Sequence, residues 1–124
     1  MTAARMKKLL IVEDEVGMSF FLQKSINRQE YQIVDMVFDG QAAIAAAKKH
    51  RPDVILMDIH IRGPLDGIET VAEIRRFSDA PVIYLTALPD PVNEMRIKQT
   101  TWASLLVKPV TVKRLDQEIR LLLG

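Results

Sequence analysis

The sequence predicts an α/β fold, a doubly wound sheet of five parallel strands that alternate with five helices as (βα)5. Two observations lead to this expectation. Short apolar, β-branched runs recur along the chain, and segments of helical periodicity lie between them. Three of the runs are apolar at every position, which is typical of strands buried on both faces of a parallel sheet. The predicted strands span residues 9–12, 33–37, 54–57, 82–85 and 105–107.

The elements of the first half follow from spacing and from one capping residue. Asp35 interrupts the second run, which favours an edge strand with one face wetter than the other. Asp39 is expected to cap a helix that begins at Gly40 and turns Ile44 and Ala47 inward. The helix before it is predicted from residues that share one helical face, namely Met18, Phe21, Leu22 and Ser25.

Capping signals mark the helices of the second half. Asp66, with Glu69 three residues later, forms a capping box. Asp90 is an N-cap followed by proline at the first helical position, and the helix it begins is weakly apolar. Val92 and Met95 are expected on the inner face of that helix, with Met95 as core filler. The last helix is expected to have Thr111 as its cap and Leu115, Ile119 and Leu122 on its inner face.

Composition excludes several classes of protein. The 124 residues fit one domain, and their net charge of +1 is spread evenly, so no basic surface for nucleic acid is expected. The lack of cysteine excludes disulfides, thiolate zinc sites and a cysteine nucleophile. The apolar runs are too short to cross a bilayer, and residues 1–8 lack the apolar region of a secretory signal. We therefore expect one cytoplasmic domain over residues 1–124, with no effector or DNA-binding domain and no membrane contact.

Polar side chains stand where the predicted strands end. Glu13 and Asp14 follow the first strand, Asp58 follows the third, Thr86 the fourth and Lys108 the fifth. Open α/β sheets bind ligands at this carboxyl edge. Three carboxylates that repel one another need a compensating charge, and an all-oxygen ligand set favours Mg²⁺.

The same residues suit phosphoryl chemistry. Lys108 can neutralise a phosphoryl group opposite the metal, and Thr86 can donate a hydrogen bond to one of its oxygens. A carboxylate in such a set can act as a nucleophile and form an aspartyl-phosphate. Asp58 is the best candidate because it follows four apolar residues and is central in the fold.

Over its whole length the chain resembles the CheY-like receiver domain of two-component response regulators. Five segments carry the resemblance, in the family's order and at about its spacing: residues 10–15, 52–59, 66–69, 81–87 and 106–109. The resemblance implies a flavodoxin-like sheet with strand order 2-1-3-4-5. It also implies that Asp58 accepts a phosphoryl group from a sensor histidine kinase or a phosphotransfer protein. Mg²⁺ would be held by Glu13, Asp14 and Asp58 and by the backbone carbonyl of His60.

The resemblance assigns roles to the remaining site residues. Thr86 and Lys108 would bind the phosphoryl oxygens, and the peptide bond between Lys108 and Pro109 would be cis. An apolar Leu88 would hinder in-line water, whereas His60 would orient a water molecule. The positions expected to tune the lifetime of the phosphoryl group are His60, Ala87 and Leu88.

Three features depart from the family pattern. The loop after Asp58 is one residue longer than usual and places Arg62 where proline is common. Glu13 replaces the commoner aspartate. Leu105 stands where the family usually has a switch aromatic, and Trp102, first expected as a partly buried packing residue, stands where the family keeps a small one. Output then runs through another packing change near the fourth helix, or its coupling is weak.

Three functions compete. The leading one is a receiver that catalyses its own phosphorylation and dephosphorylation and is otherwise not an enzyme. Its contact face would comprise the fourth and fifth helices and the strand between them, for a downstream protein or a second copy of the chain. A degenerate receiver used for docking or dimerisation is favoured by Leu105 and Trp102 but disfavoured by the intact acids. A haloacid-dehalogenase-like phosphatase is disfavoured because the nucleophile would follow the third strand and the chain has no room for a cap.

Overall fold

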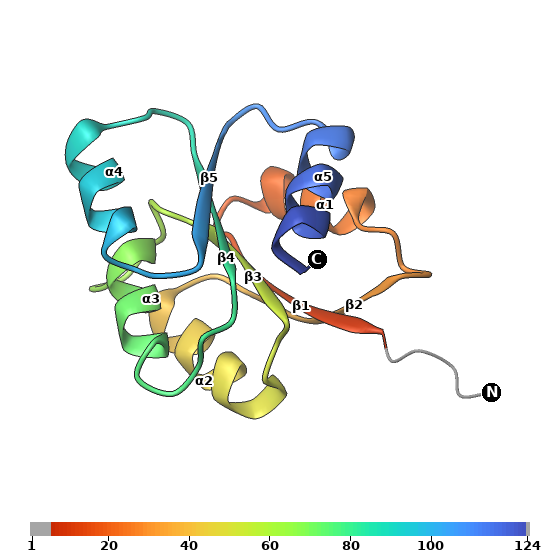
Figure 1. Ribbon diagram of the computed structural model, residues 1–124, viewed down its shortest axis with the longest axis horizontal. Coiled ribbons are helices and arrows are strands. Elements are labelled where there is room, and N and C mark those ends of the chain that lie inside the picture. The colour runs from red at the N-terminus through yellow and green to blue at the C-terminus, as the bar shows by residue number, and fades with distance from the viewer. Residues whose placement is uncertain (1–5, 124) are drawn as a thin grey trace.

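A computed structural model describes residues 6–123, in which strands and helices alternate along the chain (Figure 1). The strands are β1 (Lys7–Val12), β2 (Tyr31–Val37), β3 (Val54–Asp58), β4 (Val82–Thr86) and β5 (Ala103–Val107). The helices are α1 (Val16–Ser25), α2 (Gly40–His50), α3 (Gly67–Ile74), α4 (Pro91–Lys98) and α5 (Val112–Leu123). Each of these helices is too short or too polar to cross a bilayer.

The strands form one parallel sheet in the order β2-β1-β3-β4-β5, which confirms the predicted topology. The edge position expected for the strand containing Asp35 is also confirmed, because β2 pairs with β1 alone. After β1 the chain first crosses to β2 on one side, and β3 then returns to the other side of β1. The order therefore switches between β1 and β3, and ligands of open α/β sheets bind at such a switch.

Helices cover both faces of the sheet, with α1 and α5 on one face and α2, α3 and α4 on the other (Figure 1). Side chains of β1 alternate between the two cores: Leu10 and Val12 enter one, and Leu9 and Ile11 enter the other. All four are fully buried. Burial on both faces is the reason why residues 9–12 of this strand are all apolar.

The predicted helix starts are confirmed by hydrogen bonds from the first turn. Asp66 and Glu69 form the reciprocal capping box of α3, with bonds of 2.8 and 3.0 Å. The side chains of the other predicted caps also accept a backbone N–H, and they are Asp39, Asp90 and Thr111. Each cap satisfies a donor that the helix itself cannot pair.

The predicted inner face of α4 is wrong. Val92 and Met95 are 64% and 66% exposed, so Met95 is not core filler either. The two apolar residues lie on the outward face of α4, whereas the inner face includes Arg96, a polar residue with a long apolar stem. The face turned inward comprises Asn93, Arg96, Ile97 and, just past the helix, Thr100.

The expectation for Trp102 is also wrong. Its side chain is 66% exposed, and its backbone adopts a left-handed conformation with φ of 58°. The backbone carbonyl of Trp102 accepts a hydrogen bond of 2.9 Å from the amide of Val82, so the main chain is tied to β4 while the indole points away. Trp102 therefore contributes surface rather than core.

Candidate functional site

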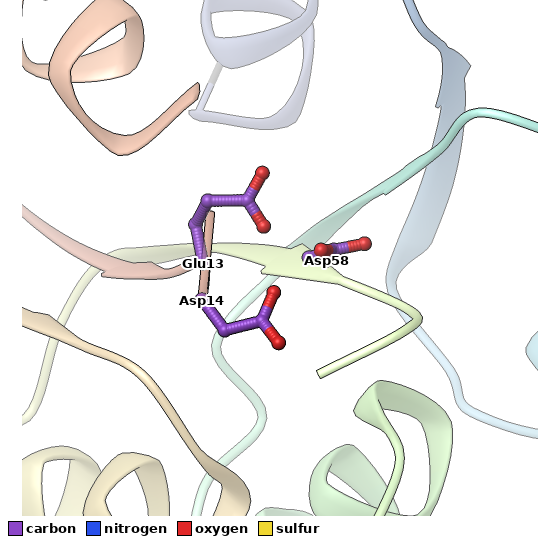
Figure 2. A group of neighbouring side chains, drawn as sticks. All are labelled: Glu13, Asp14 and Asp58. Carbon is purple, nitrogen blue, oxygen red and sulfur yellow. The ribbon is translucent and has the colours of Figure 1, made fainter. Parts of the chain in front are cut away.

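The ends of β1 and β3 bring Glu13, Asp14 and Asp58 together, as expected (Figure 2). One oxygen from each carboxylate lies within 4.8 Å of the others. The parallel pairing of β1 with β3 produces this, since Val12 lies opposite Met57 and the acids follow directly. The last apolar residue of each strand thus fixes the chain, and the next residues project their carboxylates over the edge of the sheet.

Glu13 is the most buried of the three acids, with none of its surface exposed. Its Oε1 accepts a hydrogen bond of 2.9 Å from the Lys108 ammonium, whereas its Oε2 is buried without a hydrogen-bond partner. Burial raises the pKa of Glu13 to about 8, the neighbouring Asp58 carboxylate adds to the effect, and Lys108 opposes it. One buried carboxylate oxygen is therefore available for a ligand.

Lys108 extends from the end of β5 toward two of the acids. Its Nζ lies 2.9 Å from Glu13 Oε1 and 3.6 Å from Asp58 Oδ2. Burial disfavours the charge on Lys108, but the hydrogen bond to Glu13 and the charge of Asp58 outweigh it and raise the pKa of Lys108. The ammonium thus stays charged near neutral pH, and the predicted cis peptide bond to Pro109 is confirmed.

Asp58 is 5% exposed, and its backbone is held from both sides. The next residue, Ile59, donates its amide to Leu85 of β4 at 3.1 Å and accepts from the amide of Gly67 at 2.7 Å. Gly67 opens α3 so close to Asp58 that a Cβ there would overlap the Asp58 carbonyl oxygen. The Asp58 carboxylate also accepts a hydrogen bond of 3.1 Å from the amide of His60.

Thr86 is buried at the end of β4, but its hydroxyl is engaged within its own loop. It donates to the carbonyl of Leu88 at 3.1 Å and accepts from the Leu88 amide at 3.3 Å. The Leu88 side chain is 76% exposed, and Ala87 is exposed as well. The expected contact of Thr86 with a phosphoryl group, and the tuning role of its neighbours, remain predictions.

Two polar contacts were not predicted from the sequence, one at the acidic cluster and one between β4 and the end of α4. Arg62 reaches Asp14, with Nε 3.7 Å from Oδ2 and a hydrogen bond of 3.3 Å from Nη2 to the backbone carbonyl. Tyr84 lies directly opposite Leu105 in the β4–β5 pairing, and its buried hydroxyl bonds Thr100 Oγ1 at 2.9 Å. The sequence did contain a signal for the Arg62 contact. Arg62 is a cation in the loop after Asp58, and this loop lies at the same edge of the sheet as the acids.

The donor set fits a divalent cation. It consists of hard carboxylate oxygens alone, which Mg²⁺ prefers, and it includes the buried, unpartnered Oε2 of Glu13. Because three carboxylates face the Lys108 ammonium and the exposed Arg62 guanidinium, a bound cation would offset the remaining repulsion. The structure thus defines a doubly wound fold with an acidic cluster and a lysine at the carboxyl edge of its sheet.

The comparison with protein families agrees with this class. The family model of the response regulator receiver domain matches residues 9–120, and the chain belongs to that family. It is a response regulator receiver domain of the two-component type, with a CheY-like fold.

Curated relatives share about a third of their aligned residues with this chain. The transcriptional regulatory protein PdtaR of Mycobacterium tuberculosis is 33% identical over 119 residues, which cover 96% of this chain and 58% of the relative. The probable transcriptional regulator ycf27 of Guillardia theta is 34% identical over 117 residues, which cover 94% of this chain and 45% of the relative. The chain therefore spans about half the length of these curated relatives.

Solved structures match over nearly the whole fold. The signal receiver domain of a modulated diguanylate cyclase from Desulfovibrio desulfuricans has a TM-score of 0.87 at 29% identity, covering 96% of this chain and 94% of the other. The chemotaxis protein CheY4 of Vibrio cholerae has a TM-score of 0.84 at 26% identity, and the match covers 95% of this chain and 99% of the other.

Proposed function

We propose that this domain is the phosphoacceptor of a cytoplasmic two-component phosphorelay, acting as one receiver unit over residues 1–124. Asp58 takes a phosphoryl group from a sensor histidine kinase or a phosphotransfer protein. One observation carries the proposal: the Asp58 carboxylate lies within 4.8 Å of two further acids and 3.6 Å from the Lys108 ammonium. This arrangement places a nucleophile between ligands for a cation and a fixed positive charge.

In the transfer step, a carboxylate oxygen of Asp58 attacks phosphorus while the phosphorus–nitrogen bond of the donor phosphohistidine breaks. The electron pair of that bond goes to the imidazole, which leaves and takes up a proton. Lys108 pairs with a phosphoryl oxygen and stabilises the charge that spreads over the group. Mg²⁺ held by the acids would neutralise the opposite side of the phosphoryl group when bound. The residues that would hold it are Glu13, Asp14, Asp58 and the backbone carbonyl of His60.

Loss of the phosphoryl group requires attack by water in line with the bond to Asp58. His60 follows Asp58 by two residues, and its side chain is exposed at the rim, where it can orient a water molecule. The exposed Ala87 and Leu88 border the same approach from the end of β4, and the apolar Leu88 hinders water. The balance between these neighbours sets the lifetime of the acyl phosphate.

Output begins when the Thr86 hydroxyl leaves Leu88 for the phosphoryl group. It reaches a downstream protein, or a second copy of the chain, through the face formed by α4, β5 and α5, in which the edge strand β5 lies between the two helices (Figure 1). Large exposed apolar side chains support an interaction surface there. They are Val92, Met95, Trp102, Val107 and Val112.

The chemistry is tested by intact-mass measurement after incubation with acetyl phosphate and MgCl2. We expect one phosphoryl adduct on the wild type and on Asp35→Asn, which removes an exposed acid from the edge strand. We expect none on Asp58→Asn or in the presence of EDTA. An adduct that persists in Asp58→Asn contradicts the proposal.

A docking module without phospho-switching is the second candidate, favoured by the exposed Trp102 and by Leu105 in place of an aromatic. The two functions differ in how the protein responds to adduct formation. A change in Trp102 fluorescence or in oligomeric state that accompanies the adduct supports the switch. An adduct that changes neither supports the docking module, while the chemistry at Asp58 stands.

A further inference from the structure

The loop between β3 and α3 places a second cation at the acidic cluster. Nε of the Arg62 guanidinium lies 3.7 Å from Oδ2 of Asp14, and Nη2 donates to the Asp14 backbone carbonyl at 3.3 Å. The Arg62 side chain is 69% exposed, so it reaches the acid from the solvent side. Arg62 therefore contacts Asp14 at both the side chain and the main chain.

The backbone holds Arg62 in this position. Arg62 pairs with Asp39 in an isolated parallel β-bridge, which joins the loop to the start of α2. Ile61, just before it, is 8% exposed and packs in the core shared by α2 and α3. Gly63, just after it, has φ of 96°, a conformation that glycine adopts without strain. The guanidinium thus extends toward Asp14 from an anchored segment rather than from a loose loop.

The two cations at the site serve different acids. Lys108 pairs with Glu13 and Asp58, whereas Arg62 is the cation that lies beside Asp14 within residues 6–123. Asp14 is also the most accessible acid of the cluster, with 22% of its side chain exposed. A divalent ion entering from solvent therefore meets Asp14 together with the Arg62 guanidinium beside it.

We propose that Arg62 is a resident counter-ion of Asp14 that competes with the divalent cation and so sets the affinity of the site for Mg²⁺. The inference rests on the proposed function, because it takes Glu13, Asp14 and Asp58 as the cation ligands. When the ion binds, Arg62 releases the Asp14 carboxylate and turns to solvent. The competition is moderate because an exposed ion pair contributes little, and added salt weakens it further.

Calorimetric titration of the unphosphorylated protein with MgCl2 tests this proposal directly. Arg62→Gln removes the charge but keeps a polar side chain, and it should raise the association constant about three- to tenfold. Arg76→Gln is the matched control, since it removes the same charge from a site beyond the far end of α3, where Arg76 is 77% exposed and pairs with Glu73. The affinity of Arg76→Gln for Mg²⁺ should stay within about twofold of the wild-type affinity. Arg62→Lys, which keeps the charge, should remain closer to wild type than Arg62→Gln.

A second readout follows Arg62 itself. In the Nε–Hε region of the NMR spectrum, the Arg62 signal should move toward the position of a free arginine as Mg²⁺ is added, in step with the calorimetric binding curve. An affinity in Arg62→Gln that equals or falls below that of wild type overturns the proposal while leaving the metal site intact. Failure of both proteins to bind Mg²⁺ overturns the proposed cation site as well. Binding by Arg62→Gln but not by wild type supports the competition in its strongest form.

Discussion

Gly67 gives the sharpest structural prediction, because it connects the start of α3 to the backbone of Asp58. The amide of Gly67 donates to Ile59 at 2.7 Å, so the two segments are already in contact through their main chains. In Gly67→Ala, the new Cβ would overlap the Asp58 carbonyl oxygen and lie 2.9 Å from Ile59 Cα and 3.0 Å from the Asp58 carbonyl carbon. All of these neighbours are backbone atoms, so no side chain can move aside.

The magnitude depends on which segment must yield. Overpacking a well-packed site costs about 1–3 kcal/mol, and a clash with backbone that is tied to β4 belongs at the upper end. We therefore expect Gly67→Ala to lower the free energy of unfolding by about 3 kcal/mol. A domain of this size has a stability of about 5–15 kcal/mol, so the variant should still fold.

Gly17→Ala is the matched control. Gly17 lies in the first turn of α1, where an added Cβ meets nothing closer than 3.7 Å. Alanine in a helix should instead raise the free energy of unfolding by about 0.5–1 kcal/mol. Urea unfolding followed by circular dichroism compares the two substitutions on one scale, and the acetyl-phosphate reaction should slow in Gly67→Ala alone because Asp58 is displaced. Equal stability of the two variants would refute the close packing of α3 on Asp58.

Three further predictions concern Glu13, Tyr84 and Asp66. In metal-free protein the pKa of Glu13 is raised from 4.5 to about 8, so the folded state holds this proton more tightly than the unfolded state. The contribution of the protonated Glu13 to the free energy of unfolding should therefore fall as the pH rises between those two values. Glu13→Gln should remove this pH dependence in urea unfolding with EDTA. Tyr84→Phe should lose about 1 kcal/mol for the buried hydrogen bond to Thr100, and a double-mutant cycle with Thr100→Val should show coupling of similar size. Asp66→Ala should cost about 1–2 kcal/mol in thermal unfolding, since it removes the capping box that Asp66 forms with Glu69. The Glu13 prediction is contradicted if wild type and Glu13→Gln show the same pH dependence of stability. The Tyr84 prediction is contradicted by zero coupling between Tyr84 and Thr100, and the Asp66 prediction by an unchanged melting temperature.

Much of the fold was predictable because its signals are local. Residues 9–12 of β1 and 54–57 of β3 are all apolar since both faces of these strands are buried. The N-caps are one or two residues with a fixed spacing. The clustering of the three acids was predictable for the same reason. Glu13, Asp14 and Asp58 directly follow buried strands, and the carboxyl ends of parallel strands meet at one edge.

The missed features depend on side chains and backbone angles that distant segments decide. The inner face of α4 contains Arg96, whose guanidinium lies 2.9 Å from Asp66 at the start of α3, and the apolar pattern of the helix does not reveal this long-range ion pair. The contact of Arg62 with Asp14 joins residues 48 positions apart in the chain. Trp102 takes a left-handed backbone conformation that is uncommon for a residue with a large side chain. Propensity and periodicity carry no information on any of these three.

Every proposed step of signalling depends on Asp58 becoming an acyl phosphate, and site-specific trapping detects that species. Borohydride reduces an aspartyl-phosphate to homoserine, which tandem mass spectrometry locates in a digest of the protein. After reaction with acetyl phosphate and MgCl2, we predict homoserine at position 58, and its absence when EDTA is present. Homoserine at another aspartate, or no reduced residue at all, would contradict the assignment of Asp58 as the phosphoacceptor.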